Sequence, residues 1–153
     1  MSSSVTLEKA EIIKPLKVVE ADKGKYRFMH MFEMRLFTNR GDFLWRVYPY
    51  YDSNCGSIPW VGQKVLHVKS YDPDNPLQNA FFFLHDDLYQ KKGYGIFNRE
   101  DSDAICRGGL REAGCSRFQA STIDFFLMIG AWGHWGDNAY NNAESLSSLE
   151  IVK

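Results

Sequence analysis

The chain has 153 residues and a formal net charge of −1, from 18 basic and 19 acidic side chains. A chain of this length forms one domain and buries roughly 70% of its unfolded surface, so it needs no disulfide framework. The balanced charge argues against a nucleic-acid-binding protein and against a polybasic membrane anchor. No run of about 18 apolar residues is present, so we expect no transmembrane segment. The expected organisation is one domain over 1–153, with 1–4 and about 137–153 as peripheral tails.

The first half of the chain shows strand patterns. Residues 5–20 hold two short apolar runs separated by Pro15. Residues 25–37 alternate between two faces, and after a Gly-containing loop residues 43–51 form a second apolar run. Two runs joined in this way are typical of a β-hairpin. Residues 64–69 are a further short strand candidate.

From about residue 72 the apolar spacing becomes helical. Asn75, Asn98 and Ser116 each suit a helix N-cap, and Ser116 with Gln119 makes a capping-box pattern. Helices are expected over residues 76–92, 99–113 and 117–134. Apolar residues surround most of the third helix, which predicts that it is the central one. The sequence therefore predicts an α+β fold, with a small N-terminal antiparallel sheet packed against three C-terminal helices.

The three cysteines, Cys55, Cys106 and Cys115, are scattered and odd in number. This pattern favours reduced thiols, and free cysteines are usually buried. A catalytic cysteine needs an activating neighbour, and the sequence indicates none.

Two polar residues lie on apolar helix faces. His85 follows Phe81 by four positions on the first helix, and Asp103 precedes Cys106 by three on the second. An unpaired buried polar group costs about 1–3 kcal/mol, so the two residues are expected to pair. Two interpretations stay open. The pair either fixes the helix register, or Asp103 orients His85 so that its other ring nitrogen acts as a general base.

The neighbours of His85 extend this hypothesis. Asp86 stands beside the histidine and is a candidate ligand for a hard cation such as calcium. The alternative for Asp86 and Asp87 is a solvated helix surface, which is favoured for Asp87. Tyr89, one turn after His85, is expected to be a packed ring, and Arg99 is a candidate ion-pair partner for one of the aspartates.

Four motifs occur in a characteristic order. They are the stretch 53–59, which contains Asn54, Ser57 and Ser-Ile-Pro, the His-Asp-Asp-Leu-Tyr block at 85–89, the stretch from Arg99 to Asp103, and the helix 120–130. This order resembles the phage family called domain of unknown function 1353. The resemblance implies a tailed-phage or prophage origin, and a location in the host cytoplasm during infection or in the virion. It implies no particular reaction.

The site also resembles that of secreted-type phospholipase A. His85, Asp86, Tyr89 and Asp103 match four places at which those enzymes carry the base, a calcium ligand, a tyrosine and the aspartate that orients the base. The Gly-rich calcium loop and the disulfides of those enzymes are missing, so the likeness is one of site geometry alone.

Three classes of function remain open. The chain is a hydrolase that uses His85 and Asp103 to activate water, a non-catalytic virion component of the tail, neck or capsid surface that contacts other virion proteins, or a host-directed binding protein. The discriminating observation is whether His85, Asp86 and Asp103 open onto a cleft or are sealed in the core.

Overall fold

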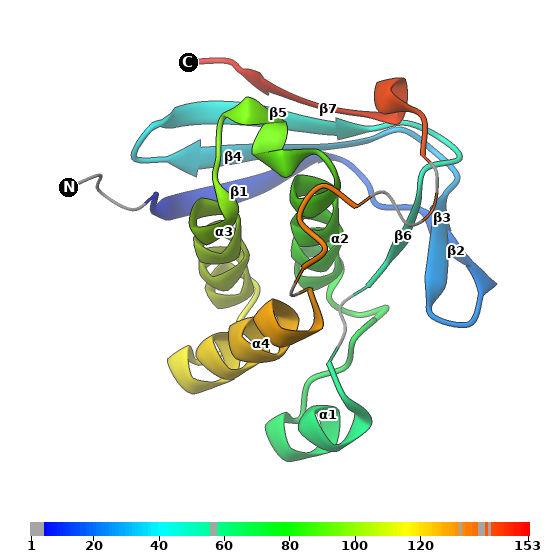
Figure 1. Ribbon diagram of the computed structural model, residues 1–153, viewed down its shortest axis with the longest axis vertical. Coiled ribbons are helices and arrows are strands. Elements are labelled where there is room, and N and C mark those ends of the chain that lie inside the picture. The colour runs from blue at the N-terminus through cyan, green and yellow to red at the C-terminus, as the bar shows by residue number, and fades with distance from the viewer. Residues whose placement is uncertain (1–4, 56–57, 132, 138–139, 141) are drawn as a thin grey trace.

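A computed structural model describes residues 5–55, 58–131, 133–137, 140 and 142–153 (Figure 1). The strands are β1 (Leu7–Lys14), β2 (Val18–Asp22), β3 (Lys25–Phe28), β4 (Phe32–Thr38), β5 (Gly41–Val47), β6 (Asp52–Asn54) and β7 (Ser147–Ile151). The helices are α1 (Trp60–Leu66), α2 (Pro76–Gln90), α3 (Arg99–Glu112) and α4 (Arg117–Gly130), with short 3₁₀ turns η1 (Lys92–Gly95) and η2 (Glu144–Leu146). This is the α+β fold expected from the sequence.

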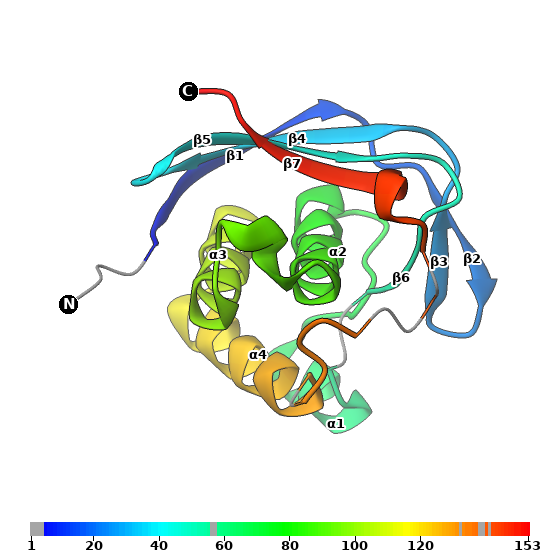
Figure 2. The same ribbon diagram turned by 45° about the horizontal axis from the view of Figure 1, so that its top comes forward.

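The strands form two antiparallel sheets. The larger has the order β1-β4-β5-β7 and the smaller β2-β3-β6. The larger sheet curves over α2 and α3, which lie side by side beneath it, and α4 crosses below them on the side away from the sheet (Figure 2). The predicted hairpin is confirmed as β4 and β5, although the run 25–37 divides at residues 29–31, and its first part joins the smaller sheet as β3.

Two predictions about the backbone are wrong. Residues 64–69 are not a strand, because Gly62 and Leu66 are buried four residues apart on one face of α1, and His67 ends the helix in the left-handed region with φ of 56°. The segment after residue 137 is not wholly a peripheral tail. Ser147–Ile151 forms β7 on the edge of the larger sheet, where Leu149 pairs with Trp45 and both side chains are buried.

The predicted caps are confirmed, whereas the predicted central helix is wrong. Asn75, Asn98 and Ser116 each accept a hydrogen bond from a backbone N–H of the first turn of α2, α3 and α4. The helix that packs closely on all sides is α2, with twelve of its fifteen residues buried. In α4 only Ala120, Ile123 and Leu127 are buried. Phe118, Phe125 and Ile129 of α4 are exposed, whereas Phe126 is partly buried and lies against Gly62 of α1.

Nothing in the described ranges resembles a membrane-spanning helix in length and apolar character.

Candidate active site

The predicted contact between His85 and Asp103 is confirmed. His85 lies on α2 and Asp103 on the neighbouring α3, and His85 Nε2 is 2.8 Å from Asp103 Oδ1. A carboxylate only accepts hydrogen bonds when ionised, so this contact places the ring proton on Nε2. The tautomer with this proton leaves the ring lone pair on Nδ1. The backbone of α3 approaches α2 closely here, because Gly109 lies against the ring of Phe81.

Tyr89 completes the pair. Its hydroxyl donates a 2.8 Å hydrogen bond to the same Asp103 Oδ1, and its ring lies against the imidazole of His85, with centroids 4.5 Å apart. Burial and the Asp103 carboxylate raise the pKa of Tyr89, while the charge of Arg99 opposes them. The expectation of a packed ring is confirmed, and the hydroxyl additionally holds Asp103 in place.

His85 and Tyr89 border a pocket of about 210 Å³. The lining residues are Asn54, Phe82, His85, Asp86, Tyr89, Leu127, Gly130, Ala131, His134 and Asp137. The His85 side chain is nearly enclosed, with 5% of its surface exposed. Its Nδ1 forms no hydrogen bond with a described residue. Among the described residues, Nδ1 is also not one of the fully buried polar atoms without a hydrogen-bond partner. His85 is one of the residues that line the pocket, and Nδ1 is the ring nitrogen that Asp103 leaves without a contact.

The pocket lining includes a second histidine, His134, that the sequence did not single out. His134 Nδ1 is 3.0 Å from Asp137 Oδ2, and both side chains are exposed. The only signal in the sequence is that His134 and Asp137 are three residues apart in a Gly-containing stretch. The pocket is thus lined by His85, whose partner Asp103 is not part of the lining, and by the exposed pair of His134 and Asp137.

Asp86 turns from α2 toward β6. Its Oδ2 accepts hydrogen bonds from Ser53 Oγ and, at 2.9 Å, from Gln90 Nε2. Burial raises the pKa of the Asp86 carboxyl to about 6, although the two donors lower it. The side chain is therefore a partly buried, hydrogen-bonded acid at the pocket wall.

The described residues do not fit the calcium site considered for Asp86. Calcium takes six to eight oxygen ligands. Within the described ranges no group of three His, Cys, Asp or Glu side chains is placed to hold a metal ion. One oxygen of Asp86 is already bound to Ser53 and Gln90, and the other nearby carboxylate, Asp137, is paired with His134. We therefore assign no step to a metal.

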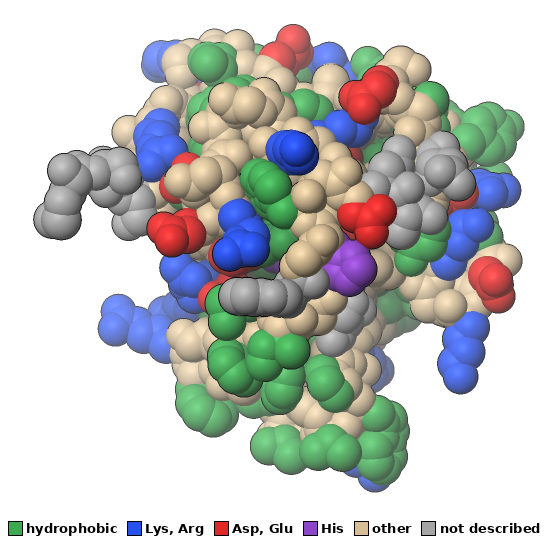
Figure 3. All heavy atoms as spheres, viewed as in Figure 1, with side chains coloured by type: hydrophobic (Ala, Val, Ile, Leu, Met, Phe, Trp, Pro, Cys, Tyr) green, Lys and Arg blue, Asp and Glu red, His purple; other side chains and the backbone are tan. Residues whose placement is uncertain are grey.

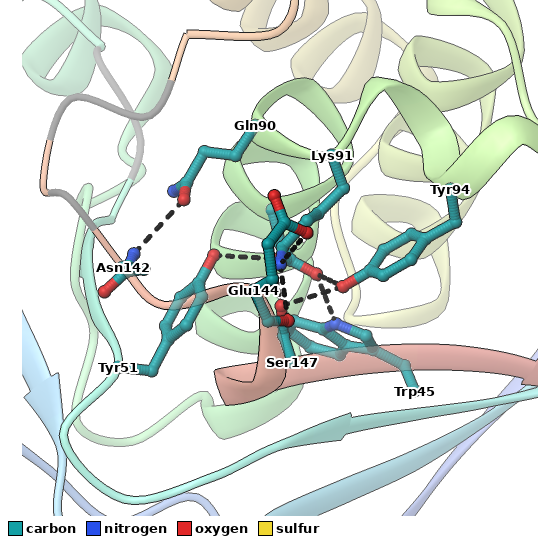
Figure 4. A network of polar contacts seen from close by, with 9 residues as sticks. Trp45, Tyr51, Gln90, Lys91, Tyr94, Asn142, Glu144 and Ser147 are labelled. Carbon is teal, nitrogen blue, oxygen red and sulfur yellow. Dashed lines mark hydrogen bonds and ion pairs between the residues drawn. The ribbon is translucent and has the colours of Figure 1, made fainter.

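Asp87 was favoured as a solvated surface acid, and this prediction is wrong. Its side chain is completely buried. Figure 4 shows Trp45, Tyr51, Tyr94 and Ser147, the four residues that hydrogen-bond to its carboxylate, pointing toward one another. Oδ1 accepts from the Tyr51 hydroxyl at 2.7 Å and from Ser147 Oγ at 2.8 Å. Oδ2 accepts from Trp45 Nε1 at 2.9 Å and from the Tyr94 hydroxyl. The carboxylate therefore ties α2 to β5, β7 and η1.

The remaining predicted residues have different positions. Asn54, at the end of β6, lines the pocket, and Ser57 lies outside the described residues. Arg99 begins α3, and its charge acts on Tyr89. Of the α3 acids in the motif, Asp101 is paired with Arg40 at 2.9 Å, and Asp103 with His85.

The cysteines are free and buried, as expected. Burial raises the pKa of each thiol, including Cys55 near the pocket, so none is an activated nucleophile.

Comparisons with protein-family models, with curated proteins and with solved structures each gave no match. The resemblance to the phage family therefore stays a prediction.

Proposed function

We propose that this chain is a hydrolase in which His85 activates a water molecule for attack on an ester. The observation that carries the proposal is the free Nδ1 of His85 at the pocket, on a ring whose Nε2 is held by Asp103. A histidine that only fixed helix register would need no open ring nitrogen. The lining includes apolar side chains such as Phe82 and Leu127, which suit the uncharged part of a substrate.

The chemistry follows from the tautomer. A water molecule beside Nδ1 gives up a proton to the imidazole while its oxygen forms a bond to the ester centre. The imidazolium that results is stabilised by the Asp103 carboxylate, and it returns its proton to the leaving alcohol when the ester bond breaks. Tyr89 keeps Asp103 aligned through its hydrogen bond to Oδ1. His85 is the catalytic residue, and Asp103 and Tyr89 are positioning residues.

The phage setting is part of the proposal and depends on the resemblance alone. A small hydrolase made during infection would act in the host cytoplasm or as part of the virion. Both locations suit an enzyme that needs no disulfide and whose described cysteines are free thiols.

The test compares His85→Gln and Asp103→Asn with the unchanged chain on carboxylic and phosphoric esters of a chromogenic alcohol. Removing a general base lowers the rate by about 10²–10⁴-fold. Asp103→Asn retains an acceptor oxygen for Nε2 but loses the charge that stabilises the imidazolium, so turnover should fall far more than the melting temperature does. Each assay is repeated with a chelator, which should not change the rate.

The matched control is His30→Gln, because His30 is exposed and lies outside the pocket lining. It should leave turnover unchanged. Folded His85→Gln and Asp103→Asn proteins that hydrolyse at the unchanged rate would refute the proposal. The same result in a phage growth assay would favour the non-catalytic virion component.

A further inference from the structure

Another pocket, of about 380 Å³, lies where the start of β1 meets α3 and α4, on the side of the molecule away from the smaller sheet (Figure 1). Its lining includes three arginines and two residues with hydroxyl groups, namely Arg107, Arg111, Arg117, Thr6 and Ser121. We call this pocket the arginine groove. Figure 3 shows Lys and Arg side chains protruding at the left edge of the molecule, beside α3. The groove shares no lining residue with the pocket of His85.

Small residues make room for the groove. Ala104 and Gly108 lie one turn apart on the face of α3 that also carries two of the arginines. Gly108 allows α3 to approach β1 closely, because a Cβ atom there would be 3.0 Å from Leu7 Cβ. On α4, the small side chain of Ala120 is buried beside the groove. The three elements therefore meet through short side chains, and the arginines are the longest side chains in the lining.

Two of the three arginines have no acidic partner. Arg107 Nη1 is 2.8 Å from Asp124 Oδ2, so the charges of this pair largely cancel. Arg111 Nη1 donates a 3.2 Å hydrogen bond to the carbonyl of Cys115, which leaves the charge of Arg111 unbalanced. Arg117 is exposed and forms no hydrogen bond or ion pair with a described residue. The groove therefore holds the positive charges of Arg111 and Arg117.

The nearby acids do not balance these charges. The acids closest along the three elements are Glu8, Glu100 and Glu112, and none of them lines the groove or forms an ion pair with its arginines. The side chain of Glu112 points about 100° away from the residue before it on α3. Glu100 precedes Arg107 by seven residues, or about 10 Å along the helix axis, which is about the distance over which salt screens a charge. Glu8 is exposed, about 7 Å along β1 from Thr6.

Arg117 also departs from the usual placement of charge on a helix. It is the first residue of α4, and the first turn of this helix has no acidic side chain. The positive end of the helix dipole favours acids at this position and disfavours an arginine. A bound anion would be attracted by the helix end and by Arg117 together. Local departures of this kind are expected at functional sites.

We infer that the arginine groove binds the phosphate group of a small soluble phosphate monoester. Guanidinium groups stay charged at all ordinary pH values, and their paired N–H groups match phosphate oxygens. A phosphate monoester carries a charge of about −1.5 to −2 at pH 7, which matches Arg111 and Arg117 together. Its oxygens can also accept hydrogen bonds from the hydroxyl groups of Thr6 and Ser121. A carboxylate carries one charge only, so an acidic side chain of another protein matches the groove less well.

The test is isothermal titration calorimetry of the full chain with phenyl phosphate and with methyl phenyl phosphate, a diester that carries one charge only. Phenyl phosphate should bind at least about ten-fold more tightly, because a charged hydrogen bond contributes about that factor or more. Arg111→Gln combined with Arg117→Gln should weaken its binding by at least about 100-fold. The matched control is Lys14→Gln with Lys17→Gln, which makes the same change in net charge at two exposed residues outside the groove. It should bind phenyl phosphate as the unchanged chain does.

The pH dependence tests the charge of the ligand separately. The second pKa of a phosphate monoester is about 6, whereas the arginines keep their charge. Lowering the pH from 8 to 5 should therefore weaken the binding of phenyl phosphate by at least about ten-fold. The affinity for methyl phenyl phosphate should change much less over the same range, because its charge stays at −1.

Four results would overturn the inference. They are the absence of binding of phenyl phosphate, equal binding of the two esters, equal loss of binding in the lysine control, and tighter binding of a glutamate-rich peptide or of vesicles that contain phosphatidic acid. The last result would assign the groove to an acidic protein segment or to a lipid headgroup. His85→Gln should bind phenyl phosphate as the unchanged chain does, so failure of the groove and failure of the proposed hydrolase are observed separately.

Discussion

Tyr94→Phe should destabilise the fold through the buried carboxylate of Asp87. The two oxygens of a carboxylate offer about four acceptor positions. Tyr51, Ser147, Trp45 and Tyr94 fill all four. Phe removes one donor without changing the ring, and a hydrogen bond to a charged group contributes about 1.5–3 kcal/mol. We therefore expect the free energy of unfolding to fall by about that amount.

The measurement is thermal and urea unfolding followed by circular dichroism. In a chain of this size each kcal/mol lowers the melting temperature by roughly 2–4 °C, so Tyr94→Phe should melt about 3–12 °C lower. The control is Tyr50→Phe, because the Tyr50 side chain is 68% exposed. It should stay within about 0.5 kcal/mol of the unchanged chain. A Tyr94→Phe protein as stable as the Tyr50→Phe control would refute the reasoning.

Asp87→Ala should destabilise the fold more than Tyr94→Phe does, because it removes the acceptor of all four hydrogen bonds. It leaves Trp45 Nε1 and the Tyr51 hydroxyl buried without an acceptor, while Tyr94 and Ser147, 2.9 Å apart, can still pair with each other. Each orphaned donor costs about 1–3 kcal/mol, against a typical total stability of about 5–15 kcal/mol. The two orphaned donors together should therefore lower the free energy of unfolding by about 2–6 kcal/mol and the melting temperature by roughly 4–24 °C, and a cooperative melt close to that of the unchanged chain would contradict the network.

Two further predictions concern α2 and its neighbour. The pKa of Asp86 is raised from its ordinary 3.8 to about 6, so the stability that its neutral form provides is complete below pH 3.8 and is lost as pH rises through about 6. Asp86→Asn keeps an acceptor for Ser53. It should be more stable than the unchanged chain by about 1–3 kcal/mol at pH 8, and the two proteins should be equally stable at pH 4. The same difference in melting temperature at both pH values would contradict this prediction. Gly109→Ala would place a Cβ 2.1 Å from the Phe81 ring, so it should lower stability by about 1–3 kcal/mol or more, whereas an unchanged melt would show that α2 and α3 are farther apart.

The contact between His85 and Asp103 could be predicted because the spacing of apolar residues within each helix indicates it. Each residue interrupts an apolar face of one helix, and a short connection makes the two helices neighbours. The burial of Asp87 could not be predicted in this way. Its partners Tyr51, Trp45 and Ser147 are 36, 42 and 60 residues away in the chain, so only the assembled sheet brings them together.

The other errors have equally physical causes. The run 64–69 has apolar residues that fit either a strand or a helix, and only the packing of Gly62 against α4 decides for α1. The apolar content of α4 suggested a central helix because burial is the usual fate of such residues. The structure leaves three of these apolar residues, Phe118, Phe125 and Ile129, exposed.

The three consecutive residues of α2 explain how one short segment can organise the site. Successive side chains on a helix point about 100° apart, so His85, Asp86 and Asp87 face three different neighbours. His85 meets Asp103 on α3, Asp86 meets Ser53 on β6, and Asp87 meets the larger sheet. The contacts of Asp86 and Asp87 therefore fix the position of this part of α2, and with it the position of the His85 imidazole. A change at Asp87 should displace His85 as well as destabilise the fold, whereas Asp103→Asn perturbs only the charge beside the imidazole. For this reason Asp103→Asn, and not any substitution at Asp87, separates catalysis from stability.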